Sequence, residues 1–276
     1  MPASIVPAMS EPHTGTGPDT YQTLLVDRAE LVATVTLNRP HRKNAMSYTM
    51  WQELADVFTR LGRADDVRAV VVTGAEGEFC SGADLVDEDA PRQHQLSVMR
   101  LVSDVCLALH RLPQPTVAKV DGVAAGAGMN LALACDLVVA SDRARFSQIF
   151  ARRGLSIDFG GSWLLPRLIG VHKAKELVLL ADMYDATAAA EFGFVNRVVP
   201  VAELDAFVAE WASRLAAGPP IALSLSKRLL DSSFDVSFEQ ALDDEGRAQT
   251  VNISTKDTLE AISAFVEKRT PEFRGR

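Results

Sequence analysis

The chain has 276 residues, with 28 Lys or Arg against 36 Asp or Glu and a net charge of −8. This length suffices for one large domain with an appendage, or for two small domains. The acidic balance argues against a nucleic-acid or membrane-surface binder, so an anionic ligand would need a local basic cluster. Cys80, Cys106 and Cys135 have no metal-ligand spacing and indicate reduced thiols of a cytoplasmic protein without a metal site.

Residues 1–18 are rich in Pro, Ser, Thr and Gly and show no basic segment followed by an apolar core. They predict a disordered tail rather than a signal peptide. No later apolar run is long enough to cross a bilayer. The expected organisation is this tail, an α/β core over residues 19–200 and a helical region over residues 201–276.

The first elements are predicted from hydrophobic periodicity. Alternating residues 21–38 predict a β-hairpin with a polar tip at 27–30. Ser47 stands where it can cap a helix over residues 48–61. The nearly continuous apolar run 67–73 predicts a strand buried on both faces. A polar loop is expected over 86–95, followed by a helix over 96–111.

The central stretch is organised around a small-residue turn at 121–128. An apolar strand over 116–120 precedes it, and a short helix over 129–134 and a strand over 137–140 follow. A chain that passes through a Gly/Ala turn into a helix leaves backbone N–H groups unpaired at the helix start. Those donors and the positive end of the helix dipole suit an anionic oxygen.

The C-terminal region is helical in pattern almost to its end. Helices are expected at residues 203–216, 221–230, 237–251 and 255–268. Gly218-Pro219-Pro220 marks the boundary of a helical appendage. Strand–turn–helix units recur before it, from 67 and again from 116, which predicts repeated ββα units in one α/β core.

Five motifs in this order resemble the enoyl-CoA hydratase/isomerase family, the crotonase superfamily. They are residues 38–46, 79–85, 121–136, 154–170 and 264–269. The match covers about residues 21 to 273. The resemblance implies an α/β spiral of ββα units, acyl-CoA thioester chemistry, and a C-terminal helical oligomerisation region that forms trimers or dimers of trimers.

The resemblance also implies an oxyanion hole, which agrees with the unpaired N–H groups expected in the central turn. The family's two backbone N–H donors fall on Ala83 and Ala127. Donors of this kind stabilise the enolate that forms on the thioester carbonyl. Position 127 is often glycine in the family, so alanine narrows the hole slightly. The alternative is that the glycines around both residues only form tight turns.

Two positions depart from the hydratase pattern. Hydratases of the family carry one glutamate just after the Gly-rich turn and a second twenty residues later, and these positions here are Asn130 and Phe150. Asparagine takes up no proton at neutral pH and phenylalanine has none to give. A conventional two-glutamate hydration mechanism is therefore not expected.

Asp158 is the remaining candidate base. It matches the position at which the ring-epoxide and double-bond isomerases of this similar family look to carry a catalytic aspartate. One carboxylate suffices to remove a proton and return it at the other end of an allylic system. Burial beside Phe150, Phe159 and Trp163 would raise its pKa. The alternative is that Asp158 only caps a helix that begins near Gly160.

The resemblance further implies contacts to an acyl-CoA substrate, whose coenzyme A is the only cofactor-like group expected. The substrate-binding residues it implies are Arg42, Lys43, Ala45, Asp84, Leu85, Met129, Asn130, Phe150, Trp163, Phe265 and Lys268. His94 and Gln95 fall in the loop that flanks the acyl pocket, whereas His110 and His172 are interpreted as structural.

Three functional hypotheses follow. The first is an enoyl-CoA isomerase that uses Asp158. The second is another CoA-thioester reaction, namely hydration with an unconventional catalytic set, hydrolysis or a lyase reaction. The third is a non-catalytic acyl-CoA binder. A dinucleotide-binding dehydrogenase and a serine hydrolase are disfavoured, because their acidic ribose-binding position and Gly-x-Ser-x-Gly elbow do not occur.

Overall fold

A computed structural model of the chain describes residues 20–87 and 94–276. The predicted tail, 1–18, and residues 88–93 of the predicted loop lie outside the described residues. The strands are Leu24–Ala29 (β1), Val32–Leu37 (β2), Ala69–Gly74 (β3), Thr116–Val120 (β4), Val123–Ala125 (β5), Leu137–Ser141 (β6), Arg145–Ser147 (β7), Tyr184–Asp185 (β8) and Arg197–Val199 (β9). The α-helices are Tyr48–Leu61 (α1), Gln95–His110 (α2), Ala127–Leu133 (α3), Gly161–Ile169 (α4), Val171–Leu180 (α5), Ala186–Phe192 (α6), Leu204–Ala217 (α7), Pro220–Ser232 (α8), Phe238–Ile253 (α9) and Lys256–Glu267 (α10). Short 3₁₀ turns are Pro40–Arg42 (η1), Ala75–Gly77 (η2), Ile149–Arg153 (η3) and Val201–Glu203 (η4).

The strands form two sheets, and the repeated ββα units contribute strands to both. One sheet has the order β1-β2-β3-β4-β6-β9, antiparallel between β1 and β2 and parallel elsewhere. The second sheet has the order β5-β7-β8. The two strands of the unit β4-β5-α3 therefore divide between the sheets, and β6-β7 repeats this division. The predicted α/β class with repeated ββα units is confirmed.

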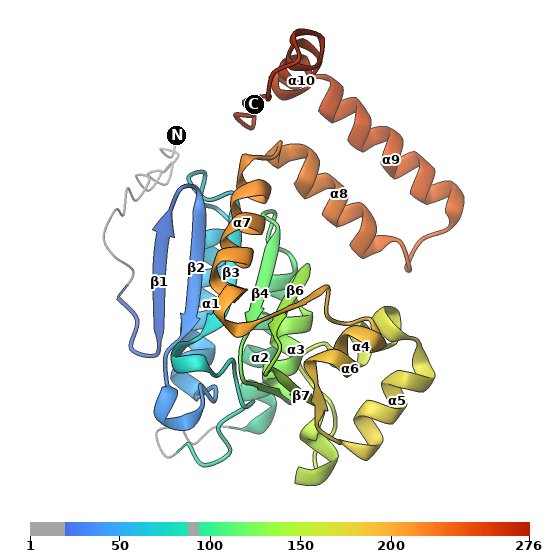
Figure 1. Cartoon of the computed structure of the whole chain (residues 1–276). Helices are drawn as coiled ribbons and strands as arrows, with labels where there is room; N and C mark the ends of the chain where they lie inside the picture. Colours follow the sequence, from blue (N-terminus) through green and yellow to red (C-terminus); the bar gives the residue numbers. More distant parts are fainter. Residues whose placement is uncertain (1–19, 88–93) are drawn as a thin grey trace, which may run out of the picture.

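The central strands are buried on both faces, as their apolar runs predict. On one face Val70 and Val72 belong to the main core with helices α1, α2 and α3. On the other face Val71, Val117 and Val139 pack against α7, through the side chains of its residues Leu204, Val208 and Ala212. Figure 1 shows α7 crossing this face of the sheet. The alternation of side chains along each strand explains why a single run of valines serves two cores.

Local signals placed several elements well. Ser47 caps α1, with its Oγ accepting a hydrogen bond from Met50 N at 3.2 Å. The hairpin forms, but its turn is at Glu30 and Leu31, whose φ angles are 49° and 68°. The predicted tip at 27–30 was too early, because strand pairing continues to the two residues that adopt the left-handed conformation.

Two features differ from the predictions. Strand β5 was not expected, because its three residues lie inside a Gly/Ala stretch that shows no strand alternation. Gln95 begins α2, and His94 caps it by accepting a hydrogen bond from Leu96 N on Nδ1, so these residues belong to the helix start and not to the loop.

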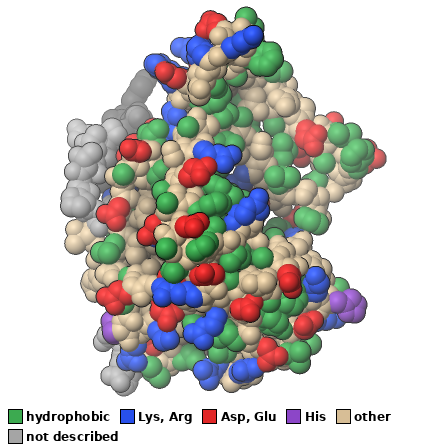
Figure 2. All heavy atoms as spheres, viewed as in Figure 1, with side chains coloured by type: hydrophobic (Ala, Val, Ile, Leu, Met, Phe, Trp, Pro, Cys, Tyr) green, Lys and Arg blue, Asp and Glu red, His purple; other side chains and the backbone are tan. Residues whose placement is uncertain are grey.

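Helices α8, α9 and α10 form an arm (residues 220–267, the C-terminal arm) that extends away from the sheet (Figure 1). It begins directly after Gly218-Pro219, which ends α7. Among its residues only Ala248, Asp257 and Ala264 are buried. Its exposed large hydrophobic side chains are those of Leu230, Phe234, Phe238, Leu242, Val251, Ile253, Leu259, Ile262, Phe265 and Val266. Figure 2 shows hydrophobic side chains gathered on the arm. No helix in the described part of the chain has the length and apolar character needed to cross a membrane.

Two ion pairs join the arm to the core among the described residues, a more exposed one of Arg167 in α4 with Asp235 at 3.2 Å and a more buried one of Lys227 with Asp136. Lys227 of α8 lies 2.9 Å from Asp136, and the side chain of Lys227 is only 10% exposed. The same Asp136 oxygen accepts hydrogen bonds from the N–H and the hydroxyl of Thr116, at the start of β4. Removing the cation from such a site leaves a carboxylate without its counter-charge.

We expect Lys227→Met to lower the free energy of unfolding by about 1–3 kcal/mol, because the Asp136 carboxylate keeps its Thr116 donors but loses its cation. Arg214→Met is the matched control, since it breaks an exposed pair with Glu210 and should cost less than about 0.5 kcal/mol. Urea unfolding at one protein concentration measures both. Equal losses of unfolding free energy in the two variants would show that the Lys227–Asp136 pair stabilises the fold no more than an exposed ion pair does.

Candidate active site

Two glycine-containing turns lie against each other at the centre of the core. Cys80 N donates to the carbonyl of Val123 at 2.8 Å, and Ala125 N donates to the carbonyl of Cys80 at 2.9 Å. A Cβ on Gly128 would lie 2.3 Å from the Cys80 carbonyl oxygen, and a Cβ on Gly82 would lie 3.0 Å from that of Ala125. Glycine is therefore required at both positions for the turns to approach this closely.

The N–H groups of Ala83 and Ala127 are both available in this arrangement. Their neighbours Asp84 and Gly126 donate to backbone carbonyls at 2.9 and 2.8 Å. Ala83 N and Ala127 N donate no hydrogen bond within residues 20–87 and 94–276. Ala127 is the first residue of α3, where N–H groups have no intrahelical acceptor. The site of a Gly82 Cβ lies only 3.9 Å from Ala127 N, so the structure brings the two turns together.

Asp158 lies in a turn with an unusual backbone. Phe159 and Gly160, which follow it, have φ angles of 45° and 75°. A phenylalanine in this conformation is strained, and burial of its ring 5.5 Å from that of Trp51 compensates for the strain. Helix α4 begins at Gly161 with Gly160 as its cap and no side-chain capping bond. The alternative that Asp158 serves as the helix cap is therefore wrong.

The carboxyl group of Asp158 is partly buried without a compensating partner. Its Oδ1 is fully buried and makes no hydrogen bond. Burial raises the pKa of Asp158 from its ordinary 3.8 to about 6, in the direction that the sequence predicts. Burial and the charge of the nearby Asp158 raise the pKa of the Cys106 thiol to about 11. A neutral thiol and apolar surroundings give the carboxylate no stabilisation.

The two positions that hold glutamates in hydratases have other roles here. Asn130 is fully buried, with Nδ2 donating to the backbone carbonyl of Asp158 at 2.8 Å and Oδ1 accepting from Gln148 Nε2 at 2.7 Å. The ring of Phe150 lies against the Gly-rich turn, 3.7 Å from the site of a Gly126 Cβ. Met129 is also fully buried. Asn130 and Met129 are thus buried within α3, and contact of their side chains with substrate stays a prediction.

A largely buried arginine that the sequence reasoning missed, Arg39 with a side chain 15% exposed, holds the first turn. Arg39 Nη2 lies 2.9 Å from Asp84 Oδ2, and Arg39 Nη1 donates to the carbonyl of Ala45 at 2.6 Å. The Asp84 side chain is 5% exposed, so it fixes the loop at 39–46 against the turn at Gly82 instead of facing a ligand. The only sequence signal for this role of Arg39 was a basic residue beside Pro40. Leu85, which follows Asp84 in the sequence, is 62% exposed.

Comparison with known proteins identifies the family. The enoyl-CoA hydratase/isomerase family model matches residues 27–276. The chain belongs to the enoyl-CoA hydratase/isomerase family. It is 38% identical over 250 residues to the 1,2-epoxyphenylacetyl-CoA isomerase of Escherichia coli K12, covering 89% of this chain and 95% of that one. It is 33% identical over 248 residues to the short-chain-enoyl-CoA hydratase of Clostridium acetobutylicum, covering 89% and 95%.

The fold of the family is shared as well. The crystal structure of the enoyl-CoA hydratase from Bacillus anthracis superimposes with a TM-score of 0.88 at 35% identity, covering 92% of this chain and 100% of that one. The predicted crotonase-like fold with a C-terminal helical region is therefore confirmed. The relatives carry the names of both isomerases and hydratases, so family membership alone does not select the reaction.

Residues predicted to bind the nucleotide end of coenzyme A are divided between two places. Arg42 is exposed beside Lys43, whose Nζ lies 3.1 Å from Glu78 Oε1. Phe265 and Lys268 are exposed near the end of α10, at the far end of the C-terminal arm (Figure 1). A single chain does not bring these two pairs together.

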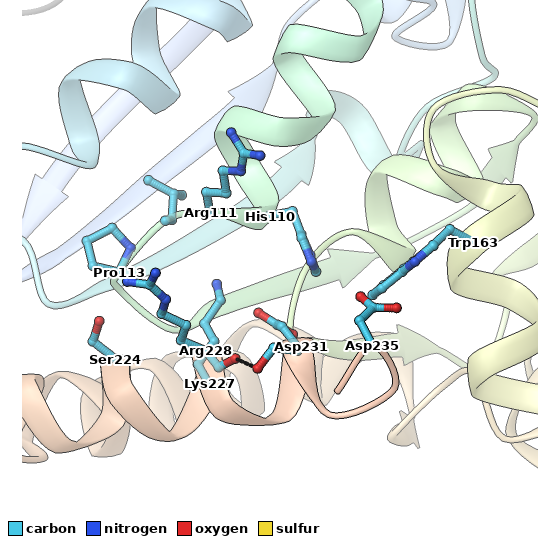
Figure 3. A pocket seen from close by; sticks show the side chains of 11 residues that line it. His110, Arg111, Pro113, Trp163, Ser224, Lys227, Arg228, Asp231 and Asp235 are labelled. Carbon is cyan, nitrogen blue, oxygen red and sulfur yellow. Dashed lines mark hydrogen bonds between the residues drawn. The ribbon is translucent and has the colours of Figure 1, made fainter. Parts of the chain in front are cut away.

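Trp163 lies on a separate cavity of about 600 Å³ between α8 and the end of α2 (Figure 3). The Arg167 guanidinium lies 3.8 Å from the centre of its ring, and His110 meets it edge-on at 5.7 Å. Figure 3 shows Trp163 pointing toward Asp235 of the segment after α8. This placement differs from the predicted position beside Asp158.

The raised pKa of Asp158 has a consequence for stability. Its carboxyl binds a proton more tightly in the folded protein, so burying the ionised form costs free energy above pH 6 and costs none below about pH 4. We expect Asp158→Asn to raise the free energy of unfolding at pH 7.5 by about 1–3 kcal/mol, after discounting for the part of the carboxyl that water reaches. At pH 5 the gain should shrink by about half. Thermal unfolding at both pH values measures it, and a loss of stability at pH 7.5 would contradict the assignment of an uncompensated carboxylate.

Proposed function

We propose that the protein is an acyl-CoA isomerase that moves a carbon–carbon double bond of an enoyl-CoA thioester, with Asp158 as the base. The observation that carries the proposal is the carboxyl of Asp158, which is half-buried without a partner and has a pKa raised to about 6. A base with a pKa near the working pH combines a high ionised fraction with strong proton affinity. Asn130 and Phe150 supply no second acid or base.

The thioester carbonyl would accept hydrogen bonds from Ala83 N and Ala127 N. Both donors lack other acceptors in the described part of the chain and lie in turns that touch each other. Such fixed donors act most strongly when negative charge develops on the oxygen, and each contributes about 3–4 kcal/mol to stabilisation of the transition state. Asp158 lies near this hole in the fold, because the Asn130 side chain of α3, the helix that begins at Ala127, donates to the Asp158 backbone carbonyl.

The reaction then needs one carboxyl group. The Asp158 carboxylate removes a proton from C2 of a 3-enoyl thioester, and the electron pair of the C–H bond forms a dienolate whose charge rests on the thioester oxygen. The neutral carboxyl returns its proton to C4, which leaves a double bond between C2 and C3. Charge and protons balance without an added reagent, so the only cofactor involved is the coenzyme A of the substrate.

Hydration is the second candidate because relatives bear that name. It requires a group that activates water and a group that protonates the α-carbon. The Asn130 amide is buried and occupied at both ends, and the Phe150 ring fills the other position. The geometry therefore supports isomerisation better.

The three cysteines are free, which fits the cytoplasm as the expected compartment.

We expect the native protein in heavy water to convert a 3-enoyl-CoA into the 2-enoyl isomer, with deuterium entering at C2 and C4, as followed by NMR. Asp158→Asn should slow turnover by about 10²–10⁴-fold while CoA-ester binding is kept. The native rate should fall as pH drops below about 6, because the base must be ionised.

Asp231→Asn is the matched control, because burial also raises the pKa of this carboxyl, which lies on α8 away from the site. Its turnover should equal that of the native protein. Hydrated product formed equally by native protein and Asp158→Asn would contradict the proposal. Release of free coenzyme A, or tight binding without turnover by the native protein, would point to a hydrolase or to a binder.

Oligomerisation would complete the site. The C-terminal arm exposes ten large hydrophobic side chains, far more than a stable monomer leaves uncovered. We propose that the arm assembles trimers, or dimers of trimers, in which Phe265 and Lys268 reach the nucleotide end beside Arg42 and Lys43 of a neighbouring copy. Lysine and arginine side chains from two subunits would then hold the phosphates.

A mixing experiment tests this arrangement. Asp158→Asn chains lack the base, and chains with Phe265→Ala and Lys268→Glu lack the arm contacts. After dissociation and joint reassembly at equal amounts, about one quarter of the sites should combine an intact base with an intact neighbouring arm. Turnover at limiting substrate measures the recovery. A mixture no more active than its two components would contradict a shared site.

A further inference from the structure

A chain of two buried amides links three segments around the candidate base. Gln148 directly follows β7, Asn130 lies in α3, and Asp158 precedes α4. Gln148 Nε2 donates to Asn130 Oδ1 at 2.7 Å, and Asn130 Nδ2 donates to the carbonyl oxygen of Asp158 at 2.8 Å. Gln148 and Asn130 are both fully buried, so solvent does not compete for these bonds.

The donors and acceptors of this chain allow only one orientation of Asn130. The carbonyl of Asp158 only accepts, so it must face the NH₂ group of Asn130. The Asn130 oxygen is then turned to Gln148, whose NH₂ group only donates. A reversed Asn130 amide would place two oxygens against each other at one end and two NH₂ groups at the other. The Asp158 carbonyl therefore sets the orientation of Asn130, and the Gln148 NH₂ group, whose own Oε1 is buried without a partner, holds the Asn130 oxygen from the other end.

Helix α4 rests directly on this amide. A Cβ on Gly161, the first residue of α4, would lie 2.5 Å from Asn130 Nδ2 and 2.6 Å from its Oδ1. The same Gly161 donates its N–H to the Asp158 carbonyl at 3.0 Å. One carbonyl oxygen thus joins the turn to the start of α4 and to α3.

Asn130 also stands three residues after Ala127 in the short helix α3. The side chain that holds the Asp158 turn and the N–H group offered to the thioester oxygen therefore belong to one rigid element. This connection couples the position of the Asp158 turn to that of the Ala127 N–H group. In proton transfer, a displacement of about 1 Å can cost about 10²-fold in rate.

We propose that Asn130, held from its other end by Gln148, is a positioning residue that holds the Asp158 base in register with Ala127 N. The inference rests on the proposed function, because it assumes that Asp158 is the base. It gives position 130 a role in this chain that an ionised carboxylate cannot fill, since a carboxylate has no hydrogen to donate to the Asp158 carbonyl.

Three variants test the proposal in the full-length protein, with double-bond migration of a 3-enoyl-CoA as the assay. Asn130→Asp keeps the shape and removes the donor, and Asn130→Ala removes the whole amide. Both should lower kcat by about 10²-fold and change KM by less than about threefold. Gln148→Leu should lower kcat in the native background and have no further effect in Asn130→Ala, because it acts through Asn130.

The pH profile separates positioning from general loss of packing. In Asn130→Asp, a second carboxylate next to the Asp158 turn should move the acid limb of kcat to higher pH, whereas Asn130→Ala adds no charge. Gln114→Leu is the matched control, since Gln114 is another buried glutamine that donates to backbone carbonyls, at Leu61 and Val67. It should lower stability without changing kcat or the pH profile.

The outcomes distinguish this inference from the proposed function. If Asp158→Asn retains full turnover, the proposed function fails and the positioning role falls with it. If Asp158→Asn is inactive but Asn130→Asp keeps native kcat, only the positioning role is overturned. A kcat loss in Gln114→Leu equal to that in Gln148→Leu, at equal folded fraction, would likewise overturn it. Additive losses in the double variant of Asn130 and Gln148 would show that Gln148 does not act through Asn130.

Discussion

The structure around the candidate site depends on holding a partly buried carboxylate without a counter-charge. Burial of Asp158 raises its pKa to about 6, and no cation or donor among the described residues offsets the cost. Folding free energy from elsewhere must hold the group in place. The tilted ring contact of Phe159 with Trp51 and the amides of Asn130 and Gln148 provide it, since each stabilises the turn without touching the carboxyl. A direct hydrogen bond or ion pair would return the pKa toward its ordinary value and weaken the base.

The division of each ββα unit between two sheets explains why the two free N–H groups meet. Strand β4 runs in the large sheet, and β5 turns into the small one before α3 begins. The bridge between Cys80 and Ala124 then fastens the turn after β3 to the new direction of the chain. Glycine at 82 and 128 is the condition for this contact, because a Cβ at either position would meet a carbonyl oxygen. The geometry of the donors is thus a property of sheet topology rather than of side-chain chemistry.

Much of the fold follows from local signals in the sequence, and the site follows from them only in part. Valine runs predicted the central strands, and Ser47 predicted the start of α1, because burial and capping act over a few residues. Strand β5 escaped prediction because pairing with β7 creates it from residues without strand character. The roles of Arg39 and Asn130 were also hidden, since each depends on partners that lie distant in the sequence. Trp163 looked like a pocket residue by position, but the helix geometry of α4 turns it toward α8 (Figure 3).

Position 130 connects these constraints to the choice of reaction. A side chain there meets the Asp158 carbonyl on one side and the Gln148 amide on the other, in a space closed by Gly161. Holding the turn requires a donor toward the carbonyl, whereas activating water requires a carboxylate that accepts a proton. One side chain cannot meet both demands at neutral pH. Under the proposed function the base is supplied instead by the turn that Asn130 holds. In this protein the residue whose carbonyl accepts from the Asn130 amide is also the one that carries the unpaired carboxyl, so under the proposed function the amide at position 130 holds the turn that bears the base.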